Sequence, residues 1–288
     1  MADTYLTLHE AAAELGVHYM TAYRYVRLGQ LAAEKQGGSW RVSRVDLDAF
    51  IAEASAAPPT SDTGSGRRRV QWSERLEARL LAGDARGAWG VLESALAAGT
   101  ELEAIYLEVL APAMASIGDR WERGELDVSV EHRATGITMR LMGRLGPRFV
   151  RRGRTRGVVV LAAPAGERHA LPVAILADLV RLRGWEVSDV GCDLPGSSLL
   201  HAVLTTPDVS AIGLSVTMDA ALPSAAEAFA LLRSSTSDVV LVVGGGAVVD
   251  EDHARALGAD ALARTAEEFV TVVEQHVSRM EDQDGMAG

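Results

Sequence analysis

The spacing of apolar residues changes along the 288-residue chain, and each change marks a different kind of structure. Residues 70–153 carry apolar positions at helical spacing, whereas continuous apolar runs of strand length begin after Gly157. Residues 54–66 are rich in Ala, Pro, Ser, Thr and Gly without any apolar period, which is typical of a flexible linker. We therefore expect a small domain over 1–53, a linker over 54–69, a helical domain over 70–153 and an α/β domain over 154–288.

Short polar breaks interrupt the helical region 70–153. They lie at Gly83-Asp84, Gly99-Thr100 and Gly124-Glu125, and they leave pieces of the length found in helix bundles. A further helix over about 128–145 follows the last break. Four short helices joined by short loops predict a four-helix bundle.

From Gly157 onward, apolar runs alternate with helical stretches. The first run, Val158 to Ala163, is continuous, as expected of a strand buried on both faces. Further strand-like runs follow at 185–190, 211–216 and 239–243 and near Ala261, each separated from the next by a helical stretch. This alternation predicts a doubly wound parallel sheet of the flavodoxin or Rossmann-like kind, so the chain as a whole is expected to be multidomain.

The first 53 residues have a pattern of their own. Residues 5–17 predict a helix that ends at a glycine, with Thr7 as its N-cap and Glu10 completing a capping box. A second helix over about 18–28 is followed by a two-stranded wing with two glycines at its tip. A closing helix then begins near Ser43.

This order of elements resembles the winged helix-turn-helix family of excisionases, which is related to the MerR fold. The resemblance covers residues 5–52 and implies that the second helix enters the major groove of double-stranded DNA. The residues expected at bases or phosphates are Tyr19, Thr21, Arg24 and Arg27 on that helix, with Lys35 and Arg41 on the wing. The alternative is a small protein-interaction domain whose arginines are only solvated.

Charge and composition restrict the possibilities further. The formal net charge of -11 argues against nucleic-acid coating and against a membrane-surface role, but one small face can still bind DNA. Because residues 1–53 carry slightly more acidic than basic residues, DNA binding would need a dimer or a larger homo-oligomer. No apolar run reaches the length of a membrane span, and the first residues lack a signal-peptide pattern. With Cys192 as its one cysteine, we expect a cytoplasmic protein without membrane contact.

Three loops of the α/β region carry candidate chemistry, and each follows a predicted strand. The first holds Glu167 and His169, the second holds Ser215 and Thr217, and the third is Gly244, Gly245 and Gly246. Because parallel strands present their carboxyl ends at one edge of the sheet, the three loops can line one slot. A neutral imidazole can coordinate a transition metal, with Glu167 as its hydrogen-bond partner, and the glycines let a bulky ligand approach the backbone.

This set of loops resembles the cobalamin-binding domain shared by methionine synthase, corrinoid proteins and B12-dependent regulators. The resemblance implies that His169 is the lower axial ligand of the cobalt. It also implies that the dimethylbenzimidazole tail lies in the slot lined by Ser215, Thr217 and Gly244 to Gly246. Pro172 departs from the glycine that the family pattern has at this position, which bears on the loop after His169.

The helical region carries a second signature. Trp121 is followed, after nine residues, by Glu131 and His132, which resembles the CarH/LitR family of light-sensing regulators. The resemblance implies that the bundle covers the upper face of adenosylcobalamin, with Trp121 against the adenosyl group and Glu131 and His132 holding it by hydrogen bonds. Glu122 stands where known members have a histidine that captures cobalt after photolysis. Without the resemblance, a core tryptophan and a solvated charged pair would be the simpler interpretation.

These resemblances predict a transcription regulator that binds operator DNA as a homo-oligomer, a tetramer or a dimer, and responds to light through adenosylcobalamin or another cobalamin. A light-independent cobalamin sensor, a corrinoid methyl carrier and a cofactor-free α/β domain remain as alternatives. We expect no enzymatic activity, because the sequence has no Ser-His-Asp grouping, no Walker A motif and no cysteine-rich zinc pattern.

Overall fold

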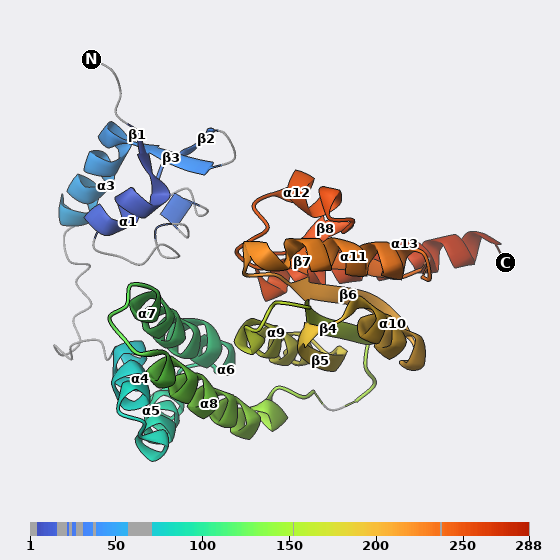
Figure 1. The fold of residues 1–288 in the computed structure, drawn as a ribbon, viewed down its shortest axis with the longest axis horizontal. Coiled ribbons are helices and arrows are strands. Elements are labelled where there is room, and N and C mark those ends of the chain that lie inside the picture. Colours follow the sequence, from blue (N-terminus) through green and yellow to red (C-terminus); the bar gives the residue numbers. More distant parts are fainter. Residues whose placement is uncertain are drawn as a thin grey trace. The chain divides into compact units, whose positions relative to one another are not determined.

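The computed structural model describes residues 5–15, 22, 25–26, 31–36, 39–56, 71–151, 153–236 and 238–287 (Figure 1). The chain divides into two units, Met1–Arg68 and Arg69–Gly288, and each has its own core. Among the helices that these residues form, none has the length and apolarity that a membrane crossing requires.

The first unit is built around a small antiparallel sheet. Its elements are β1 (Tyr5–Thr7), α1 (Leu8–Glu14), β2 (Glu34–Gln36), β3 (Ser39–Ser43) and α3 (Arg44–Ala56), and its strand order is β1-β3-β2. The predicted capping box is present, since the Glu10 amide donates to the Thr7 hydroxyl and the Thr7 amide donates to the Glu10 carboxylate. The prediction of helix from residue 5 was wrong: residues 5–7 add a third strand, because Leu6 pairs with Val42. The predicted second helix lies almost entirely outside the described residues.

The second unit begins with helices. They are α4 (Trp72–Leu81), α5 (Ala85–Ala97), α6 (Leu102–Ala104), the π-helical segment η1 (Ile105–Leu110), α7 (Ala111–Glu122) and α8 (Val128–Leu145). Because α6, η1 and α7 follow one another without a break, residues 71–151 contain four helical pieces, as the glycine breaks predict. Their buried faces share one core, and Asp84 and Asp127 cap the helices that follow them by accepting main-chain amides.

The rest of the chain confirms the predicted doubly wound α/β arrangement, drawn in yellow to red in Figure 1. Its strands are β4 (Val158–Pro164), β5 (Glu186–Leu194), β6 (Val209–Ser215), β7 (Val240–Gly244) and β8 (Ala261–Leu262), all parallel in the order β5-β4-β6-β7-β8. Its helical elements are α9 (Ala170–Leu182), α10 (Gly196–Thr205), η3 (Asp219–Ala221), α11 (Leu222–Arg233), α12 (Glu251–Ala256) and α13 (Ala266–Ala287), and the short helix η2 (Gly146–Arg148) continues α8 before them.

Helices cover both faces of the sheet. On one face, residues of α10, α11 and α12 pack with Val160 and Ile212, and on the other, residues of α9 and α13 pack with Val159 and Leu161. The central strand β4 is buried over its full length, which explains why its sequence is continuously apolar. Since the chain leaves β4 for an edge strand and then returns to the other side, the order reverses at β4 and β6, where α/β sheets bind ligands.

Candidate cobalamin-binding site

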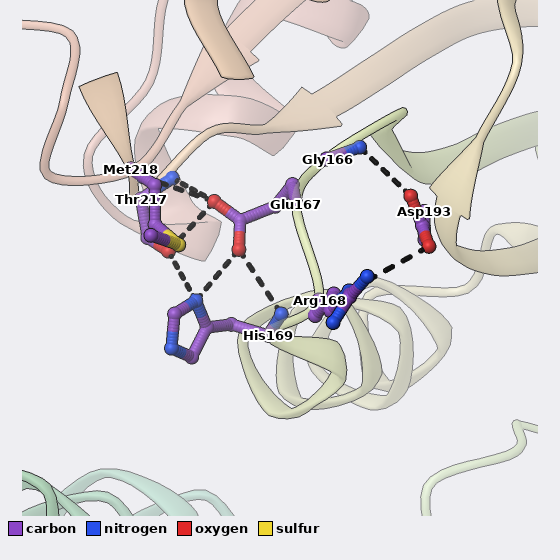
Figure 2. Close-up of polar contacts among 7 residues, drawn as sticks. All are labelled: Gly166, Glu167, Arg168, His169, Asp193, Thr217 and Met218. Carbon is purple, nitrogen blue, oxygen red and sulfur yellow. Dashed lines mark hydrogen bonds and ion pairs between the residues drawn. The ribbon is translucent and has the colours of Figure 1, made fainter. Parts of the chain in front are cut away.

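The loops that follow β4 and β6 meet through one carboxylate. Glu167 is fully buried, and its side chain accepts hydrogen bonds from residues of both loops (Figure 2). One oxygen accepts the His169 amide at 3.0 Å and lies 2.6 Å from His169 Nδ1. The other accepts the Thr217 amide at 2.6 Å, the Thr217 hydroxyl at 2.8 Å and the Met218 amide at 3.0 Å. The carboxylate therefore ties the His169 loop to the end of β6.

These contacts determine the charge of Glu167. Burial raises the pKa of this carboxyl. Hydrogen bonds from the His169 amide, the Thr217 hydroxyl and amide and the His169 ring lower the pKa, and together they outweigh the effect of burial. The net pKa lies below the usual value of 4.5. Glu167 is thus an ionised acceptor at neutral pH, and each donor around it is satisfied.

The charge of Glu167 in turn sets the tautomer of His169. A carboxylate can only accept, so the Nδ1 atom that faces it carries the proton. The Thr217 hydroxyl, which gives its proton to Glu167, lies 2.9 Å from the same Nδ1 and can accept from it as well. The lone pair is then on Nε2, which lies on the side of the ring away from Glu167 (Figure 2). A neutral imidazole with a lone pair on Nε2 is the form that binds a metal. Half of the His169 side chain is exposed, so a metal can reach it.

The two hydroxyl residues predicted from the sequence, Ser215 and Thr217, have different neighbours in the structure. Thr217 joins Glu167 and His169, whereas Ser215 is the last residue of β6 and lies opposite Gly244 of β7. Ser215 therefore lies at the carboxyl end of the central strand β6, beside the glycine loop that follows β7. The Gly244 carbonyl accepts the Val216 amide at 2.8 Å, which joins the second and third predicted loops.

Gly244, Gly245 and Gly246 differ in how much space a side chain would have. A Cβ on Gly244 would lie 2.5 Å from the Ala263 carbonyl oxygen, and one on Gly245 would lie 2.1 Å from the Val216 carbonyl oxygen. Gly245 also has a φ of +101°, which other residues rarely adopt. A Cβ on Gly246 would meet no atom within 4 Å. The fold thus requires the first two glycines, and the third leaves open space beside the site, as a bulky ligand needs.

Of the predicted residues of the helical region, Trp121 and His132 are exposed and Glu131 is partly buried. Trp121 is in the last turn of α7 and is 43% exposed, so it is not a core residue. Glu131 accepts the Thr135 hydroxyl at 2.7 Å and lies 3.7 Å from Nε2 of His132, whose ring is largely exposed. An exposed indole can contact the aromatic part of a ligand, and a carboxylate or imidazole can contact its polar groups.

The predicted DNA contacts are only partly visible. Tyr19, Thr21, Arg24 and Arg27 lie outside the described residues. The backbone of Lys35 pairs with Trp40 in the β2–β3 ribbon. Arg41 is partly buried on β3 and lowers the pKa of Glu10 weakly, after the stronger effects of Thr7, so it lies near a carboxylate of α1.

Two residues of the site were missed by the sequence analysis. Met218 contributes a main-chain amide to Glu167, and Asp193, at the end of β5, binds the Gly166 amide (Figure 2). Main-chain donors leave no signature in a sequence. Asp193 does have one signal, since it lies three residues after the predicted strand 185–190 of the same sheet, at the end where α/β sheets bind ligands.

Comparisons with known proteins agree with this geometry. Residues 5–55 match a helix-turn-helix domain family, and residues 72–145 and 157–274 match two families described as B12 binding domains. Dimethylamine corrinoid protein 3 of Methanosarcina mazei is 30% identical over 162 residues, which are 55% of this chain and 96% of that protein. The chain belongs to the B12-binding corrinoid proteins. Its cofactor is a cobalamin, as the sequence predicts.

Two further relatives differ in what they share with the chain. The HTH-type transcriptional repressor CarH of Myxococcus xanthus is 32% identical over 187 residues, which are 64% of this chain and 60% of that protein. The solved monomethylamine corrinoid protein of Methanosarcina barkeri has the same fold over 70% of this chain and 97% of its own, with a TM-score of 0.60 at 20% identity. The helix-turn-helix match confirms the class of N-terminal domain that the sequence predicts.

Proposed function

We propose that this protein is a cytoplasmic, cobalamin-dependent transcription regulator that responds to light, and that it is not an enzyme. The observation that carries the proposal is the combination, in one chain, of a helix-turn-helix domain with a His169 whose Nε2 is free to bind cobalt. The likeness to a repressor, CarH, supports the regulatory part.

In this proposal, each loop at the sheet edge has a defined task. His169 is the lower axial ligand of the cobalt, and the ionised Glu167 keeps its Nδ1 protonated and its ring in place. The dimethylbenzimidazole tail lies along Ser215, Thr217 and Gly244 to Gly246. The space beside Gly246 supports this placement, because a side chain there would lie in the path of the tail.

The helical region acts as a four-helix bundle that covers the upper face of the cofactor. Its exposed Trp121 packs against the adenosyl group of adenosylcobalamin, and Glu131 and His132 hold that group by hydrogen bonds. Adenosylcobalamin supplies a cobalt–carbon bond that light breaks. Trp121, Glu131 and His132 then lose their partner, which favours another packing of the bundle. Glu122 replaces the histidine of known light sensors, so the light state differs from theirs.

The change of packing reaches DNA through assembly. A homo-oligomer, either a tetramer or a dimer, presents several copies of the winged helix-turn-helix to double-stranded operator DNA. Tyr19, Thr21, Arg24 and Arg27 contact the major groove, with Lys35 and Arg41 at phosphates. Because one acidic copy binds weakly, DNA affinity depends steeply on the number of copies engaged.

The first experiment is an absorption spectrum of the desalted protein after incubation with adenosylcobalamin, in the dark and after green light, with DNA binding followed on the same samples. We expect a retained corrin spectrum that shifts on illumination, and a loss of DNA affinity. The variant H169A should lose the spectral features of the axial histidine. Tight DNA binding by the apo-protein and weak binding by the dark holo-protein would contradict the scheme.

A second candidate is favoured by the corrinoid proteins among the relatives, one of which the chain covers almost completely. In that case the protein carries a methyl group on the corrin for a methyltransferase. Methyl transfer to or from the bound corrin, with DNA binding that does not depend on the cofactor, would identify this function. Unchanged DNA binding on illumination of a holo-protein that needs cobalamin would instead identify a light-independent sensor.

A further inference from the structure

Asp193 lies at the end of the edge strand β5 and makes two hydrogen bonds to the loop that precedes His169. Its carboxylate accepts the Gly166 amide at 2.8 Å (Figure 2). Its own amide donates to the Glu167 carbonyl, also at 2.8 Å. A third hydrogen bond, from the Glu167 amide to the Pro164 carbonyl at 3.0 Å, closes the turn. The backbone on both sides of Gly166 is thus attached to β5.

The strand is shaped to bring Asp193 to this place. The register between β4 and β5 shifts twice, between Leu161 and Ala162 and again between Ala162 and Pro164. Gly191 and Asp193 both have positive φ, +89° and +54°, in this irregular stretch. Aspartate is one of the few residues that tolerate such a backbone, because its short side chain can bond locally. Asp193 thus has a backbone conformation that glycine would adopt more easily.

The contacts of Asp193 complete a clamp on Glu167. The Glu167 side chain accepts hydrogen bonds from Thr217 and Met218 in the loop after β6, while its carbonyl accepts one from Asp193 of β5. His169 follows only two residues later, and its Nδ1 depends on where the Glu167 carboxylate lies. The position of the imidazole is consequently determined from both neighbours of β4.

We propose that Asp193 is a positioning residue for His169, which holds the loop so that Nε2 meets the cobalt in one orientation. The inference rests on the proposed role of His169 as the axial ligand. The contact between Arg168 and Asp193 does not account for it, because the two groups are 3.8 Å apart and the Arg168 side chain is 84% exposed.

The test uses the full-length protein loaded with hydroxocobalamin, reduced to cob(II)alamin and examined by electron paramagnetic resonance. Incorporation of histidine labelled with the heavy nitrogen isotope shows whether the axial nitrogen comes from the protein. The variants are D193G, which suits the positive φ but lacks the acceptor, and D193N, which keeps an oxygen acceptor. R168A removes the ion pair alone, and D208G is the backbone control, because Asp208 has a φ of +55° beside the first residue of β6, at the opposite end of the strands.

We expect D193G to lower the ratio of histidine-ligated to histidine-free cobalt by between about threefold and tenfold, the effect of one lost hydrogen bond. D193N, R168A and D208G should keep the ratio of the unsubstituted protein. A D193G variant that ligates like the unsubstituted protein would overturn the proposal. So would a D193G variant that fails to fold while D208G folds, since Asp193 would then serve the fold alone. If the unsubstituted protein itself shows no histidine nitrogen, the axial role of His169 fails, whatever Asp193 does.

Discussion

The Tyr106 hydroxyl donates a hydrogen bond of 2.7 Å to the carboxylate of Asp178, and both side chains are buried. Tyr106 belongs to the π-helical segment that leads into α7 and Trp121, whereas Asp178 belongs to α9, which begins directly after His169. Leu179 of α9 also lies in the core of the helical region. Helix α9 thus connects the His169 loop with the helical region, where Tyr106 and Asp178 form a buried polar contact and Arg183 at the end of α9 pairs with Glu103 of α6 at 2.9 Å.

The variant Y106F tests this contact. Phenylalanine keeps the packing of the ring against Phe149, whose centroid is 4.4 Å away, and Asp178 keeps its ion pair with Arg181. The lost hydrogen bond should lower the free energy of unfolding of the second unit by about 1 to 2 kcal/mol. Denaturant unfolding measures this change. Y25F is the matched control, because Tyr25 packs on Phe50 in the other unit. An unfolding free energy equal in Y106F and the unsubstituted protein would show that the hydroxyl contributes nothing.

The buried carboxylate of Glu167 makes the stability of the apo-protein depend on pH. The pKa of Glu167 in the folded protein is below the usual value of 4.5, so its ionisation stabilises the fold above about pH 4.5. That contribution is lost as the pH falls from about 4.5 through the folded pKa, where the carboxylate takes up its proton. We expect E167Q to be less stable at neutral pH and to lose less stability on acidification. Unfolding curves across this range measure both effects, with the exposed Glu186 as control in E186Q. Parallel curves for E167Q and E186Q would contradict the prediction.

Substitutions in the glycine loop can distinguish a glycine that the fold requires, Gly245, from one that we expect only the cofactor to require, Gly246. G245A should destabilise the apo-protein by about 1 to 3 kcal/mol, because alanine meets the Val216 carbonyl oxygen and a strained φ at once. G246A should change stability by less than about 0.5 kcal/mol, since its Cβ meets nothing, but it should weaken adenosylcobalamin binding. Thermal unfolding and cofactor titration of both variants distinguish the two effects. Full cofactor affinity in G246A would place the tail elsewhere.

The elements of the α/β domain could be predicted from the sequence because each buried strand is continuously apolar and each polar loop follows a strand end. That pattern was enough to bring Glu167, His169 and Thr217 together. The contribution of Asp193 depends on register shifts and a positive φ, which apolar spacing does not encode, and the Met218 amide is a main-chain donor without a sequence signature. For the same reason, residues 5–7 were predicted as helix: three residues are too few for strand alternation to be recognised, and their pairing with β3 is decided by tertiary contact.

The exposed indole of Trp121 gives the sharpest test of how the upper face is covered. If Trp121 packs on the adenosyl group, W121A should weaken binding of adenosylcobalamin by about tenfold and leave binding of cyanocobalamin unchanged, because the two cobalamins differ in their upper ligand. The fold should tolerate the change, since the side chain is 43% exposed. V128A is the matched control, because Val128 is an apolar residue of the same region with 41% exposure. Titration of each variant with both cobalamins measures the ratio of affinities. An equal loss for the two cobalamins would show that Trp121 contacts the corrin or supports the bundle, and that the adenosyl group lies against other residues.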